Sequence, residues 1–538
     1  MLATMFLVAI AVFVVAYMTY GQWLKKLFAL DPNKETPATC LYDGIDYCPT
    51  HPAVLMGHHF ASIAGAGPIV GPIAAASLFG WLPAYIWVLV GSVFFGGVHD
   101  MGSLVASLRH KGLSVGEVVF EWIGPAAKKL FLVFTWLALT LVIAVFLELS
   151  AQTFAADPAV AFSGIVYMII AMIFGWLVYR LGFNLLYGTI VMVPVVLGAV
   201  FYGNYSPWVT AAFTFSVEFW RIALVFYIFA ASVLPVWLLL QPRDYLASFL
   251  LYFSVAIGAI GMLFLSGVDT GKLPMFTGFS PKEGLYLWPL LFITVACGAI
   301  SGFHSLVGSG TTSKQMRKET DALPVGYGAM LIEGVVAVIA LGTLILAGGM
   351  MKGGPTVVYG AGIGKMAGLI GIEPKVGTSI GLLALNSFIL TSLDTATRIA
   401  RYQFQELTGN RVDRYTATAV GVAIALVLLF WKTGNTPAWL LIWPVFGAAN
   451  QLVAAMALLA IGTWVIRCLN KPAKFIMIPM LFMLITTFAG LGLLIKDNLT
   501  KQPLLAVISA ILLVMAFFLV KMAWSAINKP TENLCKVD

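Results

Sequence analysis

The stretch HHFASIAGAGPIVGPIAAA, residues 58–76, decides the fold of this chain. It is apolar enough for a membrane helix, but five helix-breaking residues interrupt it: Gly65, Gly67, Pro68, Gly71 and Pro72. Proline removes a backbone donor and clashes with the preceding turn, and glycine weakens a helix further. Within hydrocarbon, open backbone is tolerated only where protein buries it or where it lines a polar cavity. A broken helix that opens with His58 and His59 is therefore typical of a transport site, whereas a structural kink would leave the histidines unexplained.

The composition predicts an all-α polytopic membrane protein. The chain has 538 residues, of which 60% are hydrophobic and 10% charged, whereas about a quarter of the residues of a soluble domain are charged. The net charge of +8 is expected to face the cytoplasm and the anionic lipid surface, so no nucleic-acid partner is predicted. The sequence contains no Walker A motif, which argues against an ATP-driven pump. No cofactor is predicted.

Apolar runs long enough to cross a membrane predict about 15 transmembrane helices, since each crossing needs ~20 residues. Lysine and arginine cluster after alternate runs, at Lys25 and Lys26, Arg109 and Lys111, Arg243, Lys314 and Arg317, Arg398 and Arg401, and Arg467 and Lys471. By the positive-inside rule, this alternation places the N-terminus outside and the C-terminus in the cytoplasm.

A second interruption, AASVLPVW at residues 230–237, lies in a run five segments after the first. Two interrupted helices of opposite orientation, five apart, are typical of a 5+5 inverted repeat. The predicted organisation is an extra transmembrane helix (1–30), a cytoplasmic loop (31–52), the repeat core (53–400) and additional C-terminal helices (415–530). Ser232 and Pro235 then become candidate substrate contacts at the second break.

Long runs of this sequence resemble a known family. They are TPATCLYDGIDYCPT (36–50), HPAVLMGHHFASIAGAGPIVGP (51–72), GVHDMGSLVASLRHKGLSVGEV (97–118), SGFHSLVGSGTTSKQ (301–315) and LTSLDTATRIARYQFQE (390–406). The chain resembles the carbon starvation protein CstA family across nearly its whole length. The resemblance implies a protein of the bacterial inner membrane that takes up pyruvate with protons, or peptides. It also implies a LeuT-like core of the amino acid–polyamine–organocation type.

The first break is the predicted substrate site. A half-helix that begins after such a break directs unpaired N–H groups and the positive end of its dipole into the cavity, which suits a carboxylate. Glycine also lets the backbone approach a ligand closely. Gly65, Ala66 and Gly67 are the predicted contacts, with Pro68 and Gly71 beside them. Close helix packing through small residues is the alternative explanation, and both can hold together.

A histidine–carboxylate set is the predicted proton-coupling site: His58, His59, His99, Asp100 and His304. Histidine changes its charge near neutral pH, and a neighbouring carboxylate lets it load and release a proton. Adjacent residues on a helix project about 100° apart, so His58 and His59 are not expected to face one cavity. A structural histidine–aspartate hydrogen bond is an equally good interpretation of this set. A zinc-type metal site is a weaker one.

Hydroxyls near the end of segment 285–313 raise a cation alternative. If 53–80 is the first core helix, this segment is the eighth, and in the resembled fold the eighth helix supplies hydroxyl ligands to sodium. Thr311 and Thr312, with free carbonyls near Ala64, are the candidates, although such hydroxyls commonly bond to their own backbone. Among the remaining membrane charges, Glu148 and Glu333 must face protein or water. Asp394 is expected to form a local ion pair with Arg398.

These observations favour a secondary transporter that imports a small carboxylate, with pyruvate the leading candidate, by coupling to a proton gradient. Peptide uptake and sodium coupling are the alternatives within that class. A membrane-embedded metal-dependent enzyme and a channel or sensor are the alternatives outside it. The predicted partners are a small carboxylate or short peptide, a proton or sodium ion, and the lipid bilayer.

Overall fold

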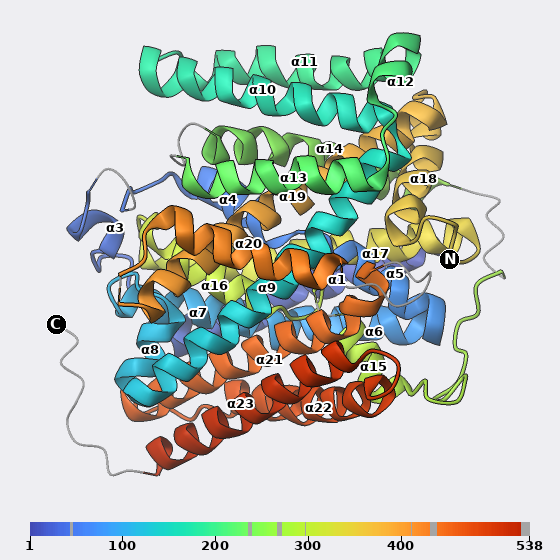
Figure 1. The fold of residues 1–538 in the computed structure, drawn as a ribbon. Coiled ribbons are helices and arrows are strands. Elements are labelled where there is room, and N and C mark those ends of the chain that lie inside the picture. The colour runs from blue at the N-terminus through green and yellow to red at the C-terminus, as the bar shows by residue number, and fades with distance from the viewer. Residues whose placement is uncertain are drawn as a thin grey trace.

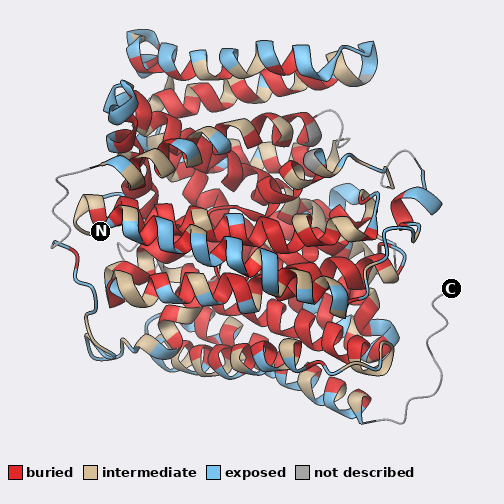
Figure 2. Ribbon diagram, turned by 180° about the vertical axis from the view of Figure 1, so that it is seen from behind, coloured by how far each residue is buried: buried red, intermediate tan, exposed pale blue. Residues whose placement is uncertain are grey.

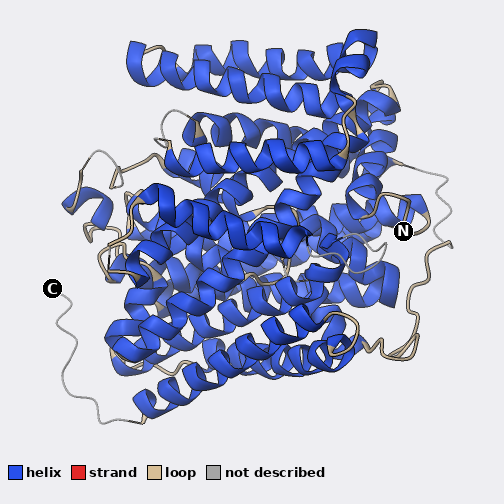
Figure 3. Cartoon of the chain, viewed as in Figure 1, coloured by secondary structure: helices blue, strands red, loops and turns tan. Residues whose placement is uncertain are grey.

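A computed structural model describes residues 1–43, 47–234, 239–265, 272–295, 297–409, 411–430 and 438–528. These residues form helices joined by loops, and no strand is found among them (Figure 3). The predicted all-α membrane fold is confirmed.

The helices in chain order are α1 (Leu2–Ala16), α2 (Gln22–Leu27), α3 (Pro37–Cys40), α4 (Pro52–Ile63), α5 (Gly67–Phe79), α6 (Trp81–Gly91), α7 (Gly97–Arg109), α8 (Val115–Trp122), α9 (Pro125–Ala156), α10 (Pro158–Leu181), α11 (Leu185–Tyr205), α12 (Pro207–Phe213), α13 (Val217–Val233), α14 (Leu240–Phe264), α15 (Leu287–Thr294), α16 (Gly302–Gly310), α17 (Ala329–Ala347), α18 (Pro355–Ala367), α19 (Pro374–Leu407), α20 (Arg414–Phe430), α21 (Ala438–Arg467), α22 (Lys474–Asn498) and α23 (Pro503–Ile527). Two π-helical turns that enter the argument are η2 (Ser92–Gly96) and η5 (Leu323–Gly328).

Within the described ranges, eleven helices are long and apolar enough to cross a membrane, and two bent pairs raise the number to 13. One of these pairs is α4–α5, which bends by 41°. If the shorter apolar helix α20 and the pair α15–α16 each count as one further span, the number of spans is 15, as predicted.

Burial separates a central group of helices from a peripheral one. The most apolar windows of the α19 and α21 spans are 94% and 100% buried, whereas that of α11 is 22% buried. Figure 2 shows this contrast, with buried positions concentrated in the middle of the bundle. The α10–α11 hairpin lies at one edge (Figure 1) and exposes large apolar side chains there, as a lipid-facing helix is expected to do.

The central helices contact one another in matching pairs. The two long helices α9 and α19 pack against each other, as do α4 and α16, α5 and α15, α6 and α17, and α13 and α20. The paired helices α6 and α17 each adjoin a π-turn, since η2 follows α6 and η5 precedes α17. The helix α7 packs on η5.

From these pairs we infer two repeats, whose first four helices are α4–α5, α6–α7, α9 and α13 in one and α15–α16, α17, α19 and α20 in the other. By chain order, α14 and α21 are then the fifth helices. On this assignment the core extends from residue 52 to residue 467, and α10–α12 is an insertion between the third and fourth helices of the first repeat.

The second interruption predicted from the sequence, at residues 230–237, begins in the last turn of α13, which ends at Val233, and its residues 235–237 lie outside the described residues. The interruption that faces α4–α5 separates α15 from α16 instead, and Ala296 within it lies outside the described residues. No proline marks this break. Gly298 adopts a positive φ of 82° there, a conformation that glycine reaches without strain.

Candidate functional site

The first break consists of residues 64–66 between α4 and α5. Its backbone folds back on itself, since the Gly65 N–H donates to the Ile63 carbonyl at 2.8 Å. No side chain caps the start of α5, where Ala66 is the N-cap residue and Pro68 occupies the first turn. Pro68 has no N–H, and the Ile69 N–H donates to the Ala66 carbonyl at 3.2 Å, so the donor at the start of α5 that lacks a side-chain acceptor is the Gly67 N–H.

The second break packs directly against the first. A Cβ atom added to Gly67 would overlap the Cys297 side chain, and one added to Gly298 would lie 3.3 Å from the Pro68 Cα atom. From α21, the Asn450 Oδ1 atom accepts from the Phe303 N–H at 2.9 Å and so caps the start of α16. The two breaks thus meet backbone to backbone, with Cys297 between them.

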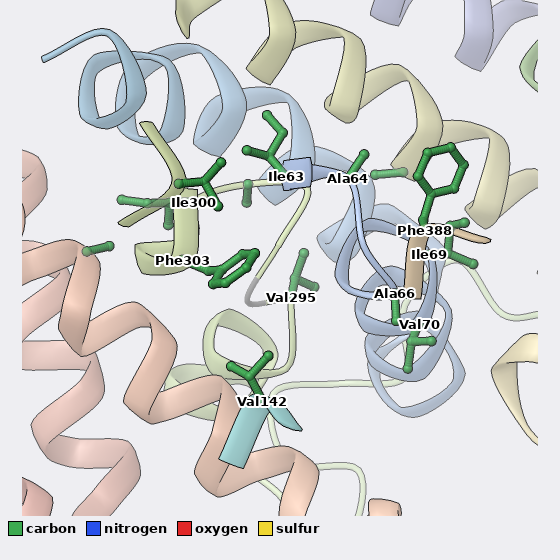
Figure 4. Packing of buried hydrophobic residues seen from close by; sticks show 14 of the residues in the cluster. Ile63, Ala64, Ala66, Ile69, Val70, Val142, Val295, Ile300, Phe303 and Phe388 are labelled. Atoms are coloured by element: carbon green, nitrogen blue, oxygen red, sulfur yellow. The ribbon is translucent and has the colours of Figure 1, made fainter. Parts of the chain in front are cut away.

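A small cavity lies where the breaks meet. It is lined by Ile63, Gly65, Gly67, Val142, Phe146, Cys297, Phe303, Ser392 and Phe446. Figure 4 shows Phe303, Val295 and Val142 beside the chain that runs from Ile63 to Ala66. Of the predicted substrate contacts, Gly65 and Gly67 line this cavity. Ala66, Pro68 and Gly71 are buried next to it along the chain. No local pattern predicts the aromatic lining, because Phe146, Phe303 and Phe446 come from three distant helices.

Beside the breaks, a cluster of titratable side chains is buried between α7, α16 and α17. Asp100 bridges two histidines: its Oδ1 atom is 2.7 Å from His99 Nδ1, and its Oδ2 atom is 2.8 Å from His304 Nδ1. The His304 Nε2 atom is 3.3 Å from Glu333 Oε2. We call His99, Asp100, His304 and Glu333 the central cluster; each is at most 2% exposed. Three of its members were predicted together, and Glu333 was predicted to face protein or water.

His58 and His59 lie on different sides of α4, as their spacing predicted. The His59 Nδ1 atom is 2.9 Å from the Thr312 Oγ1 atom, on the side of the central cluster. The His58 Nδ1 atom is 3.8 Å from Asp244 Oδ2 on α14. Neither histidine is a direct hydrogen-bond partner of the central cluster.

The hydroxyls proposed as cation ligands have other partners. The Thr311 hydroxyl donates to the Val307 carbonyl at 3.0 Å, which is the local backbone bond that competed with the cation interpretation. Thr312 is the partner of His59. The hydroxyl that faces the first break belongs to α19, where Ser392 Oγ donates to the Ser62 carbonyl at 3.2 Å. Segment 285–313 also pairs with the first interrupted helix, and so is not the eighth core helix on our assignment.

Two predictions about charged residues are wrong. Asp394 pairs with Arg243 of α14 and accepts from the Tyr227 hydroxyl at 2.8 Å, whereas Arg398 donates to the Ala231 and Leu234 carbonyls, both at 2.7 Å. Arg243 was counted among the cytoplasmic basic residues, but its side chain is fully buried.

The remaining candidates have structural partners. Glu148 forms a two-point ion pair with Arg221 of α13, at 2.6 and 2.7 Å. Ser232 lies 3.1 Å from the Thr418 hydroxyl, away from the cavity lining. Pro235 lies outside the described residues.

A metal ion is the weaker use of the site. The donor atoms of Cys297, His304 and Glu333 lie within 4.8 Å of one another. The Cys297 thiol donates a hydrogen bond to Ser301 Oγ at 3.3 Å. Binding a metal would require this thiol to lose its proton and therefore this hydrogen bond. The predicted combination of His58, His59, His99 and Asp100 does not converge on one point.

Interrupted helices that meet at a buried cavity, next to titratable side chains, define a membrane transporter. Sequence comparison then identifies the family. Residues 2–352 and 346–490 match the family described as carbon starvation protein CstA, and the chain belongs to this family. It is 34% identical to the peptide transporter CstA of Bacillus subtilis, over 96% of this chain and 95% of that protein. It is 33% identical to the pyruvate/proton symporter BtsT of Escherichia coli, over 90% of this chain and 80% of that protein.

Among solved structures, MhsT in complex with L-phenylalanine aligns over 89% of this chain and 99% of its own, with 15% sequence identity and a TM-score of 0.48. The curated relatives are transporters, and the chain is a transporter rather than an enzyme.

Proposed function

We propose that this chain is a secondary transporter that imports a small carboxylate, with pyruvate the leading candidate, together with protons by alternating access. The observation that carries the proposal is the meeting of two interrupted helices at one small cavity, directly beside the central cluster. Of the two relatives described above, one is named a peptide transporter and the other a pyruvate/proton symporter.

The small, largely apolar lining of the cavity favours the small carboxylate over a peptide. The uncapped start of α5 offers a backbone N–H to a carboxylate, and three aromatic rings line the same cavity. An acid with a short apolar tail suits this combination.

The central cluster supports proton coupling. Asp100 and Glu333 both contact His304, so a proton has acceptors within reach on either side of the ring. Burial makes any unbalanced charge in this cluster costly, which ties its protonation to the charge of a substrate that arrives nearby. Sodium coupling has less support, because Thr311 and Thr312 already have partners.

The distribution of basic residues supports a bacterial inner-membrane location with the N-terminus outside and the C-terminus in the cytoplasm. Met1 and the end of α23 lie on opposite sides of the bundle (Figure 1). The basic residues Arg109, at the end of α7, and Lys128, in the first turn of α9, are expected on the same side as the end of α23. Lys128 pairs with Glu117 and, at 2.7 Å, with Glu406, and Arg109 pairs with Glu319.

Reconstituted protein is expected to accumulate labelled pyruvate when an inward proton gradient is imposed. An uncoupler should abolish the accumulation, and replacing external sodium by potassium should leave it unchanged. Di- and tripeptides in excess serve as competitors: strong inhibition by them would favour the peptide alternative. Uptake that follows a sodium gradient and ignores the pH gradient would refute proton coupling.

A further inference from the structure

A second buried cluster lies on the opposite side of α4 from the central cluster. It contains Arg243 and Asp244 on α14, Asp394 on α19, and His58 on α4. Arg243 pairs with Asp394 and, at 2.8 Å, with Asp244. We call these four residues the lateral cluster. The three charged side chains are at most 2% exposed.

The lateral cluster contains more negative than positive charge. An arginine side chain stays protonated in proteins, so Arg243 contributes one positive charge. The Asp244 and Asp394 carboxylates contribute two negative charges when both are ionised. Burying an unpaired charge is costly unless the group takes up a proton. One bound proton, on His58 or on a carboxylate, makes the cluster neutral.

One carboxylate oxygen of the cluster has no hydrogen-bond donor within the described part of the chain and could carry that proton. The Thr391 hydroxyl donates to Asp244 Oδ1 at 3.0 Å, and Tyr227 donates to Asp394 Oδ2. Among the described residues, Asp394 Oδ1 has no hydrogen-bond partner although it is buried. It is an acceptor without a donor inside the cluster.

Other charged or titratable groups near α4 do not cancel the imbalance. Tyr167 donates to the Arg243 carbonyl and Tyr252 of α14 lies close to Gly57, and both side chains are neutral phenols. The Arg398 guanidinium is bound to the carbonyl end of α13. The central cluster lies on the other side of α4, where His59 faces it.

We propose that the lateral cluster is a second proton-binding site, which holds one proton while α4 is docked against α14 and releases it when α4 moves away. His58 is the only side chain that α4 contributes to this cluster among the described residues. Separating His58 from Asp244 removes the charge partner that favours a protonated imidazole. This inference rests on the proposed proton-coupled transport and adds one transported proton per cycle.

The ratio of protons to substrate tests the inference. It is measured in liposomes from the pH gradient at which an imposed pyruvate gradient gives no net flux, with the membrane potential held at zero. Asp244→Asn leaves Arg243 and Asp394 as a neutral pair without a proton, so the ratio should fall by one. Pyruvate exchange between labelled and unlabelled pools should continue.

A second variant reaches the same balance by a different route. His58→Lys places a lasting positive charge beside Asp244, since a lysine titrates near pH 10.4, and it should also lower the ratio by one. It provides the test if Asp244→Asn fails to fold, as judged by gel filtration and thermal melting. Ser254→Ala is the matched control, because Ser254 is a buried α14 residue that bonds to Tyr359 at 3.0 Å, and its ratio should equal that of the parent.

The outcomes separate this inference from the proposed function. If parent protein ignores the pH gradient, both are wrong. If parent protein is proton-driven and either variant transports with an unchanged ratio, only the second proton site is refuted.

Discussion

Asp100→Asn is expected to abolish concentrative uptake, so that internal pyruvate rises only to the external concentration under an inward proton gradient. Asp100 is the one carboxylate that contacts both His99 and His304. An asparagine at this position keeps the shape and one acceptor but removes the negative charge that stabilises a protonated His304. The measurement is accumulation of labelled pyruvate in liposomes, with exchange between internal and external pools as a second readout.

Exchange should survive in this variant, because the cavity lining does not include Asp100. Gln152→Leu provides a control, since Gln152 bonds at 2.8 Å to Glu148 of the separate Glu148–Arg221 pair and contacts no member of the central cluster. Full accumulation by a folded Asp100→Asn protein would show that the His99–Asp100–His304 contact is a structural link only.

Gly67→Leu is expected to prevent correct folding, and Gly67→Ala to lower the melting temperature. Even a single methyl group at this position would overlap Cys297, whose Cα atom would be 3.5 Å from the new Cβ atom. Overpacking of this kind costs about 1–3 kcal/mol for a small group. Gly198→Leu on α11 is the matched control, since no heavy atom lies within 4 Å of a Cβ atom added there.

A compensating change tests whether Cys297 is the cause. Gly67→Ala combined with Cys297→Gly removes the overlapping atoms, and should recover the melting temperature lost in Gly67→Ala. Pyruvate binding measured on the same purified samples separates packing from ligand contact. A Gly67→Leu protein that melts like the parent but fails to bind pyruvate would show instead that Gly67 contacts the ligand, as predicted from the sequence.

Local sequence was enough to predict the first break, because the glycines and prolines of residues 65–72 act on their own backbone. It also predicted that His58 and His59 face different surroundings, since helix geometry fixes the angle between neighbours. The second break escaped prediction because it contains no proline and depends on Gly298. On our assignment, counting five segments from the first break fails because the insertion α10–α12 lengthens the first half.

The lateral cluster was beyond reach of local reasoning for a different reason. Arg243 and Asp394 are 151 residues apart, and only the packing of α14 on α19 brings them together. An arginine in a membrane protein is normally assigned to a cytoplasmic loop. The neighbouring Asp244 was the one available signal that this arginine is neutralised inside the protein.

The tight cavity has a consequence for which carboxylates are accepted. A cavity this small has no room for an anion together with its full hydration shell. A substrate must leave most of that water outside and exchange it for the few backbone donors at the start of α5. Discrimination among carboxylates of similar size should therefore follow how strongly each one is hydrated, with the more readily dehydrated anion preferred.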